Sequence, residues 1–282
     1  MERLLNVACL QTRPMPDFDQ ALVEATKLAQ EAVKNGAEFI ALPEYCGGLK
    51  TEGGVFTPPF ASENEHPVLL GLQQFAKDNA VAMLIGSVAI PGPDGKIRNR
   101  SFLVNKLGQT SAVYDKIHMF DIQLSENEVY RESAKVSAGD TAVVTDMGFA
   151  KIGQSVCYDL RFPDLYRRMA QNGAEMLTIP AAFTKKTGEA HWHVLNRARA
   201  IENCAFVVAP CSVGLVDGGG EAYGHSLIIN PWGEVLAEGS AETGVIQATI
   251  NLDEVANARA KIPSLNHDRP FGVQIETKAN VT

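Results

Sequence analysis

Lys-Ile-Gly-Gln-Ser-Val-Cys-Tyr-Asp-Leu-Arg-Phe-Pro-Asp-Leu, residues 151–165, is the segment from which the fold can first be read. An apolar run that ends at Cys157 predicts a short strand, and a polar turn follows it. Pro163 then fits the first turn of a helix, where its missing N–H is not needed. A thiol at the point where a strand breaks into a turn lies at the rim of a sheet, as in a nucleophile elbow. The alternative is a buried structural cysteine, which is the commoner fate of a free thiol.

Strands and helices alternate along the rest of the chain. Leu4–Gln11 predicts a first strand. Apolar residues over 21–33 recur at helical spacing, and Asn35-Gly36 supplies a left-handed stop for that helix. The segment 97–115 predicts a hairpin that turns at Lys106–Gln109. Further strands are expected at 38–43, 82–90, 142–146, 151–156, 176–180, 205–212, 224–230 and 244–250, further helices near 68–79, 163–172, 190–203 and 252–259, and loops at 46–66 and 117–140.

This order of elements predicts an α/β protein whose sheets are mixed, because hairpins such as 97–115 place antiparallel strands among the others. The strands are too numerous for one open sheet, so we expect two packed sheets with helices outside each. The predicted fold is therefore a four-layer α-β-β-α sandwich with two mixed sheets. No repeat or linker interrupts the pattern, so residues 1–282 are expected to form a single domain, with a short C-terminal extension from about residue 265.

Composition and charge exclude several classes of protein. A chain of 282 residues that is 45% hydrophobic can bury a large core. Its net charge of −8 and the lack of any Lys/Arg run argue against a nucleic-acid partner or a membrane surface. Nothing near the N-terminus resembles a signal peptide, and no apolar run approaches the roughly 20 residues of a membrane span. Five scattered cysteines without CxxC spacing argue against a disulfide framework, so a cytoplasmic location is expected.

Three reactive side chains stand where predicted strands end. Glu44 follows Phe-Ile-Ala-Leu-Pro, Lys116 follows Val-Tyr-Asp, and Cys157 ends the strand quoted above. The ends of strands in α/β sheets converge on a shared crevice, where ligands bind. Taken singly, Glu44 and Lys116 are better explained as solvated charges. Their joint placement with Cys157 favours one common site.

Three motifs carry a resemblance to a known family. They are Leu-Pro-Glu-Tyr (42–45), Tyr-Asp-Lys-Ile-His-Met-Phe-Asp (114–121) and Ser-Val-Cys-Tyr-Asp-Leu-Arg-Phe-Pro (155–163). In order and spacing they resemble the catalytic motifs of the nitrilase superfamily of carbon–nitrogen hydrolases, and the likeness runs from Val7 to about Pro270. The resemblance implies an α-β-β-α sandwich that is usually paired into homodimers or larger assemblies.

The resemblance also implies a Glu–Lys–Cys triad. By position, Cys157 is the nucleophile, Glu44 the general base and Lys116 the stabiliser of the oxyanion. These roles suit a thiol, because the thiolate is the attacking form and needs a base or a cation beside it near pH 7. Attack on an amide carbonyl makes an oxyanion, which Lys116 and the backbone N–H of Tyr158 can hold.

A second glutamate of the family falls on Glu132, within Tyr-Arg-Glu-Ser-Ala. Glu126 and Glu128 lie close by in the sequence and remain alternatives for this position. We expect a buried Glu44 beside Glu132 to have its pKa raised by desolvation and like charge, which suits a group that both takes and gives a proton.

The residues after the cysteine indicate one branch of the superfamily. Tyr-Asp-Leu-Arg-Phe-Pro stands where true nitrilases have Trp-Glu, and segments 181–203 and 223–233 resemble the amidase branch of deaminated-glutathione amidases and omega-amidases. The implied substrate is a small amide that bears a carboxylate, hydrolysed through a cysteine thioester with release of ammonia. Hydrolysis of N-carbamoyl compounds or small aliphatic amides, or a catalytically idle binding or scaffold protein, remain alternatives.

A carboxylate on the substrate needs a cation in the pocket. Arg161 is the candidate, because a guanidinium can hold a carboxylate bidentately. The alternative for Arg161 is a salt bridge to Asp159 or Asp164. Phe183 and Thr187 match positions that line the pocket in the amidase branch.

Other polar residues carry no function in this interpretation. His191 and His193 are two residues apart, which is wrong for one face of a helix, and no partner ligands are evident, so no metal site is predicted. No phosphate-binding glycine motif occurs, so no cofactor is expected. Arg197 and Arg199 are better explained as a helix-surface or interface feature.

Overall fold

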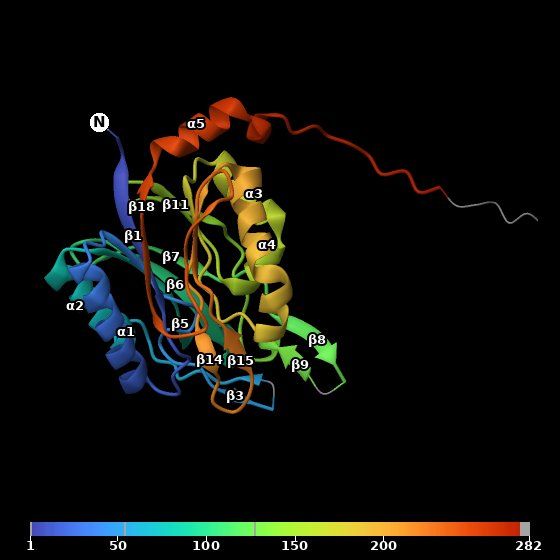
Figure 1. The fold of residues 1–282 in the computed structure, drawn as a ribbon. Coiled ribbons are helices and arrows are strands. Elements are labelled where there is room, and N and C mark those ends of the chain that lie inside the picture. The colour runs from blue at the N-terminus through green and yellow to red at the C-terminus, as the bar shows by residue number, and fades with distance from the viewer. Residues whose placement is uncertain (1, 54, 127, 277–282) are drawn as a thin grey trace, which may run out of the picture.

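The structure is a computed structural model, which describes residues 2–53, 55–126 and 128–276, except for the side chain of Glu128. Figure 1 shows two twisted sheets with α-helices on their outer sides. The predicted four-layer α-β-β-α sandwich with two mixed sheets is thereby confirmed.

The first sheet combines strands from the first half of the chain with the last strand. In spatial order these are β18 (Gly244–Asn251), β1 (Leu4–Gln11), β2 (Phe39–Ala41), β5 (Ala82–Pro91), β6 (Ile97–Val104) and β7 (Thr110–Asp115). Strands β1, β2 and β5 pair in parallel, while β18, β6 and β7 join them antiparallel. The parallel strands at the centre direct their carboxyl ends to one edge of the sheet.

The second sheet repeats this plan with strands from the second half of the chain. In spatial order these are β10 (Val143–Asp146), β11 (Lys151–Gln154), β12 (Met176–Thr178), β13 (Phe206–Ala209), β16 (Leu227–Ile229) and β17 (Val235–Glu238). Strands β11, β12 and β13 are parallel, and β10, β16 and β17 are antiparallel neighbours.

Helices cover the outer face of each sheet. Helices α1 (Phe18–Lys34) and α2 (Pro67–Asn79) cover the first sheet, and α3 (Pro163–Gln171) and α4 (Lys185–Asn203) cover the second. The last helix, α5 (Asp253–Lys261), follows β18.

Burial explains why the central strands are apolar on both faces. In β1, Ala8 and Leu10 pack against the helices, while Val7 and Cys9 pack against the second sheet. Successive side chains of a strand point to opposite faces, so a sheet covered on both sides needs a continuous apolar run. The interior consists of one apolar layer between the sheets and one under each helical layer.

Several short elements lie in segments that the sequence predicted as loops or left unassigned. The expected loop structure of segments 46–66 and 117–140 is incomplete, because their strands are only two to five residues long and therefore give a weak signal, even where polar and apolar residues alternate as in 121–125. These segments contain β3 (Thr51–Glu52), β4 (Val55–Phe56), β8 (Asp121–Ser125), β9 (Glu128–Arg131) and η2 (Glu132–Ala134). Other short elements are η1 (Pro93–Gly95), η3 (Cys157–Arg161), β14 (Val213–Leu215), β15 (Glu221–Tyr223) and η4 (Ser264–Asn266).

After η4 the chain continues to residue 276 as an extended, exposed segment that leads away from the sandwich (Figure 1). Within the described residues, none of the helices combines the length and apolar character needed to cross a membrane.

Candidate active site

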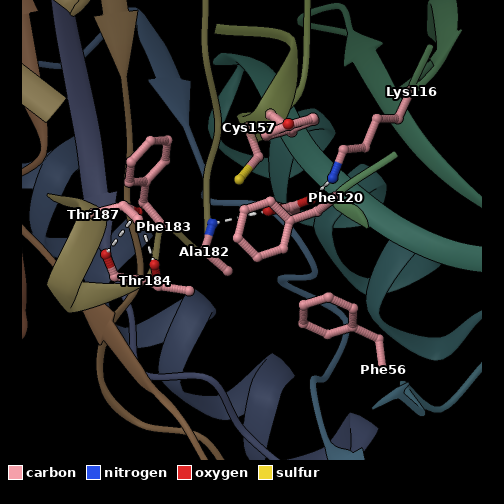
Figure 2. A pocket seen from close by; sticks show the side chains of 10 residues that line it. Phe56, Lys116, Phe120, Cys157, Ala182, Phe183, Thr184 and Thr187 are labelled. Atoms are coloured by element: carbon pink, nitrogen blue, oxygen red, sulfur yellow. Dashed lines mark hydrogen bonds and ion pairs between the residues drawn. The ribbon is translucent and has the colours of Figure 1, made fainter. Parts of the chain in front are cut away.

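Cys157 lies where the chain turns after β11. Its backbone N–H donates to the carbonyl of Pro180 at 2.9 Å, and η3 begins at this residue. The φ angle of Cys157 is +50°, in the left-handed region that non-glycine residues rarely occupy. Cys157 is 7% exposed, so it is more buried than a residue at an open rim, but its sulfur points into a cavity (Figure 2).

Glu44 is held just beyond the end of β2 by an irregularity in the neighbouring strand β5. The register of β5 shifts around Gly86 and Ser87, and the hydroxyl of Ser87 accepts the backbone N–H of Tyr45 at 2.9 Å. A Cβ atom at Gly86 would lie 1.9 Å from the carbonyl oxygen of Leu42, so only glycine permits this approach. A bulge of this kind redirects the adjoining chain, and here it positions the carboxylate of Glu44.

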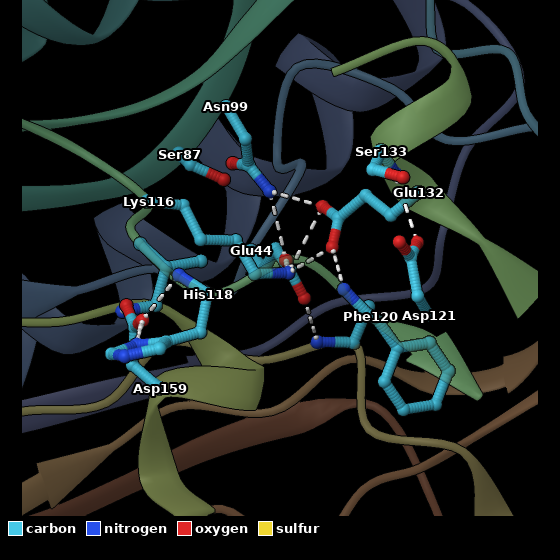
Figure 3. A network of polar contacts seen from close by, with 12 residues as sticks. Glu44, Ser87, Asn99, Lys116, His118, Phe120, Asp121, Glu132, Ser133 and Asp159 are labelled. Carbon is cyan, nitrogen blue, oxygen red and sulfur yellow. Dashed lines mark hydrogen bonds and ion pairs between the residues drawn. The ribbon is translucent and has the colours of Figure 1, made fainter. Parts of the chain in front are cut away.

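Lys116 connects two buried carboxylates. Its ammonium donates to Glu44 Oε1 at 2.9 Å and to the two carboxylate oxygens of Glu132 at 3.0 and 2.8 Å (Figure 3). Glu44 Oε1 also accepts from the side-chain amide of Asn99 at 2.9 Å, and Oε2 accepts the backbone N–H of Ala182 at 2.9 Å. Every one of these bonds restricts the orientation of Glu44.

Glu132 is the glutamate that the structure brings to this centre. It is fully buried and accepts the backbone N–H of Phe120 at 2.7 Å and the amide of Asn99 at 3.3 Å. Glu126 is exposed, and the side chain of Glu128 lies outside the described part of the structure. Of the two candidates whose side chains are described, Glu126 and Glu132, Glu132 therefore has the contacts expected of the second carboxylate.

The protonation of Glu44 and Cys157 follows from burial and charge. Burial raises the pKa of Glu44, but the ammonium of Lys116 and a hydrogen bond from the Cys157 thiol outweigh it, so the pKa lies below its ordinary value of 4.5. Burial and then the negative charge of Glu44 raise the pKa of the Cys157 thiol well above 9.0. The resting state at neutral pH is therefore a neutral thiol that donates to a carboxylate.

The expected rise in the pKa of Glu44 is thus wrong in direction. The rise occurs at Glu132, where burial outweighs the attraction of Lys116 and the negative charge of Glu44 adds to it. Burial alone lowers the pKa of Lys116, but Glu132 and Glu44 together raise it well above 10.5. The ammonium is shared by two carboxylates, and Glu44 has the additional donors from Cys157 and Ala182 that keep it ionised.

Asp159 connects the lysine segment to the cysteine segment. This fully buried carboxylate accepts the hydroxyl of Tyr114 at 2.7 Å, the backbone N–H of His118 at 3.0 Å and the backbone N–H of Val156 at 2.8 Å. The imidazole of His118 also contacts it at 2.7 Å and stacks on Phe162. These bonds fix Lys116 and Cys157 relative to one another.

A small cavity opens over the three reactive groups. Aromatic rings and two threonines form most of its wall (Figure 2). It is lined by Glu44, Phe56, Lys116, Phe120, Cys157, Tyr158, Ala182, Phe183, Thr184 and Thr187. Tyr158, Phe183 and Thr187, which the sequence placed at the pocket, are among these residues.

Arg161 lies beside the cavity and is not one of its lining residues. Its guanidinium carbon is 5.5 Å from the centre of the Phe183 ring and 5.8 Å from that of Tyr158. The guanidinium also donates to the imidazole of His191 at 3.3 Å. Arg161 thus lies against two of the rings that line the cavity, and its role in holding a substrate carboxylate stays a prediction.

The alternative for Arg161, a salt bridge to a nearby aspartate, is absent from the ion pairs of the described residues. Asp164 pairs with Arg168 at 2.8 Å, and Asp159 accepts the bonds from the lysine segment.

Arg199 is a residue whose role the sequence interpretation missed. It is buried, and its guanidinium donates to the carbonyl of Leu160 at 3.0 and 2.7 Å and to Glu202 at 2.7 Å. The expectation of a surface feature is wrong for Arg199, which supports the turn after Cys157. Helical spacing could have indicated that Arg199 is buried, because it lies on the same face of α4 as the buried residues Trp192, Asn196, Ala200 and Asn203.

Residues 6–260 match the family model described as carbon-nitrogen hydrolase. The chain belongs to the carbon–nitrogen hydrolase family. This carbon–nitrogen hydrolase is 39% identical over 266 residues to a deaminated glutathione amidase of Synechocystis sp., covering 92% of this chain and 96% of the relative. It is 34% identical over 276 residues to the omega-amidase NIT2 of Xenopus tropicalis, covering 98% of this chain and 99% of the relative.

A solved structure supports the same assignment of this carbon–nitrogen hydrolase. The crystal structure of the C. elegans NitFhit protein superposes with a TM-score of 0.85 at 28% identity, over 94% of this chain. The chain spans 65% of the NitFhit chain. The resemblance drawn from three motifs is confirmed, and the chain is a hydrolase of the amidase branch of the nitrilase superfamily.

Proposed function

We propose that this amidase hydrolyses a small amide that bears a carboxylate, through a thioester on Cys157. The observation that carries the proposal is the convergence of the Cys157 thiol, the Glu44 carboxylate and the Lys116 ammonium on one cavity. These groups come from three distant segments, and together they supply a nucleophile, a base and a cation. The mechanism uses no cofactor.

The first half of the reaction forms the thioester. The thiol sulfur attacks the amide carbonyl while its proton passes to Glu44, to which the thiol already donates a hydrogen bond. Lys116 and the backbone N–H of Tyr158 hold the oxyanion, and the loss of one such donor typically raises the barrier by about 3–4 kcal/mol. Glu44 then gives its proton to the nitrogen and the C–N bond breaks, so that ammonia leaves from a primary amide and the corresponding amine leaves from a substituted amide.

The second half regenerates the enzyme. Glu44 takes a proton from a water molecule, the water oxygen attacks the thioester carbonyl, and the C–S bond breaks to release the acid. The sulfur recovers the proton from Glu44, which completes the cycle. Glu132 acts as a positioning residue, since its contacts with Lys116 and Asn99 hold both groups against Glu44.

As the substrate we propose deaminated glutathione or an amide of a keto acid. The names of the two relatives support this substrate class. Thr184 and Thr187, whose hydroxyls lie 2.7 Å apart, can hydrogen-bond a polar acyl chain. Arg161 lies against the rings of Tyr158 and Phe183, which line the cavity, and in this proposal its guanidinium holds the distal carboxylate of the substrate.

Replacing Arg161 with alanine should weaken the binding of acidic substrates. The loss of a charge-assisted hydrogen bond is worth roughly 1.5–3 kcal/mol, so we expect KM to rise about ten- to a hundredfold with little change in kcat. The measurement compares a carboxylate-bearing amide with its neutral methyl ester. Arg168→Ala, which removes an exposed guanidinium from α3, is the matched control. An equal loss of activity on both substrates would show that Arg161 only supports the fold.

The proposed function is tested by measuring the nitrogen product across a panel of amides, as ammonia from primary amides and carbamoyl compounds and as the dipeptide cysteinylglycine from deaminated glutathione. The panel contains deaminated glutathione, keto-acid amides, N-carbamoyl amino acids and short aliphatic amides. We expect turnover to be fastest with deaminated glutathione or the keto-acid amides. Preference for an N-carbamoyl or aliphatic compound would favour the alternative hydrolases, and no turnover together with tight binding would favour an idle scaffold.

The acid limb of the pH–rate profile should reflect the lowered pKa of Glu44. Glu44 must be ionised to accept the thiol proton, and its pKa in the folded chain lies below 4.5. We therefore expect kcat/KM to stay flat from pH 7 down to about 4.5 and to fall only below that pH. Circular dichroism at each pH separates this fall from unfolding, and a midpoint near pH 6 in folded protein would contradict the assignment.

We also propose that the protein is a cytoplasmic homodimer. All five cysteines, each within the described residues, are free thiols, which suits a reducing compartment. Val194 and Ile201 on α4 and the neighbouring Trp232 are exposed apolar side chains that a second copy can cover. Analytical ultracentrifugation measures the oligomeric state directly.

A further inference from the structure

A second cluster of polar side chains lies apart from the proposed triad. His193 comes from α4, His225 from the turn between β15 and β16, and Glu238 from the end of β17. His193 Nε2 and His225 Nδ1 each lie 3.0 Å from Glu238 Oε1. The three potential ligand atoms all lie within 4.8 Å of one another.

In this cluster His225 and Glu238 are the partners of His193, which the sequence analysis did not find. His191 and His193 do not act together, because the imidazole of His191 accepts from Arg161 instead. The partners of His193 are far along the chain, on a different layer of the sandwich. Spacing within one helix therefore gave no indication of them.

Contacts with the surrounding structure fix the positions of His193, His225 and Glu238. The indole N–H of the fully buried Trp192, next to His193, donates to the carbonyl of His225 at 2.7 Å. Glu238 is paired with Leu227, two residues beyond His225, across the β16–β17 ladder. His225 has φ of +52°, a left-handed conformation that tends to persist where the surroundings enforce it.

We propose that His193, His225 and Glu238 bind one divalent transition-metal ion of the Zn²⁺ type. Two imidazoles and a carboxylate are a common ligand set for zinc, with water in the fourth tetrahedral position. Donor atoms of a tetrahedral zinc site lie roughly 3.3 Å apart, close to the two 3.0 Å separations seen here. On binding, each neutral imidazole moves its N–H proton to the other ring nitrogen and gives its lone pair to the ion.

The cluster is open enough for an ion to enter. The side chains of His193, His225 and Glu238 are 33%, 27% and 41% exposed. None of the three residues lines the cavity, and Tyr223 contacts both regions: its ring stacks on His225 and its backbone N–H donates to the carbonyl of Phe183 at 2.8 Å. An ion at this cluster ties α4 to the second sheet behind the cavity wall, without contact to the reacting groups.

The experiment measures Zn²⁺ binding to untagged, chelator-treated protein by competition with a chromophoric chelator. The Cys157→Ala background removes the proposed catalytic thiol as a competing zinc ligand. In this background we expect one equivalent of Zn²⁺, and at least a tenfold weaker affinity in His193→Ala and in His225→Ala. His191→Ala is the matched control and should bind as the background does.

Cobalt provides a second readout. With Co²⁺ in place of Zn²⁺, the intense visible absorption of a tetrahedral site should appear in the background protein and vanish in the His193 and His225 variants. Circular dichroism of the metal-free variants verifies that they fold. The proposal fails if the background protein binds no equivalent of metal, or if folded His193→Ala and His225→Ala variants bind as tightly as the background. Neither result bears on the proposed amidase reaction, which the substrate panel tests separately.

Discussion

The Cys157→Ala variant should lose ammonia release by a factor of at least about 10⁴, because no other group can form the thioester. The fold should persist, since alanine removes one sulfur atom from the cavity wall and creates no unpaired charge. Mass spectrometry of wild-type enzyme quenched during turnover should show an acyl adduct on Cys157. The same measurement on Cys157→Ala should show no adduct.

Cys46 offers a matched control for the loss of a thiol. It lies two residues after Glu44, and its buried sulfur donates to the carbonyl of Ser87 at 3.3 Å. Burial raises the pKa of Cys46 to about 12, as it raises that of Cys157, but Cys46 does not line the cavity and its thiol donates to a carbonyl instead of Glu44, so it is not a candidate nucleophile. Cys46→Ala should keep most of the activity. Turnover by Cys157→Ala, or an adduct that maps to Cys46, would falsify the assignment of the nucleophile.

The Lys116→Met variant should lose both activity and stability. Removing the ammonium leaves Glu44 and Glu132 buried without their shared cation, and breaking a buried pair typically costs about 3–5 kcal/mol in the free energy of unfolding. The pKa of Glu44 then rises, because the charge of Lys116 is a main cause that lowers it. The measurements are urea unfolding at pH 7 and the rate of ammonia release.

A double variant separates the two effects of Lys116. Adding Glu132→Gln to Lys116→Met removes one of the two unpaired carboxylates, so a substantial part of the lost stability should return. Activity should not return, because no cation faces the oxyanion. Recovery of activity in the double variant would show that Lys116 serves only to neutralise Glu132.

The layers of the fold were predictable because they depend on repeated local signals. Apolar runs marked the strands that are covered on both faces, and Asn35-Gly36 marked the end of α1. The convergence of Glu44, Lys116 and Cys157 was predictable in the same way, since each lies within three residues of the end of a strand. Short hairpins such as β8–β9 were missed, because a strand of four or five residues whose described side chains are at most half-buried gives only a weak pattern.

The residues that position the reactive groups were not predictable from local pattern. Asn99 bonds both glutamates, Asp159 joins two motifs, and Arg199 supports the turn after Cys157, but each acts across a large distance in sequence. The contact of Arg161 with the ring of Phe183 was likewise not indicated by its spacing from Cys157. The contacts of these four side chains depend on how distant segments pack in the folded chain, which the local sequence pattern does not show.

Position 157 makes opposite demands on folding and on catalysis. A non-glycine residue held at φ +50° typically costs about 1–3 kcal/mol, and glycine adopts this conformation without that penalty. A glycine there would relax the main chain but remove the sulfur. Selection for thermal stability alone would therefore favour glycine at position 157, and the resulting protein would have no nucleophile. Position 157 should be kept as cysteine when the enzyme is engineered for stability.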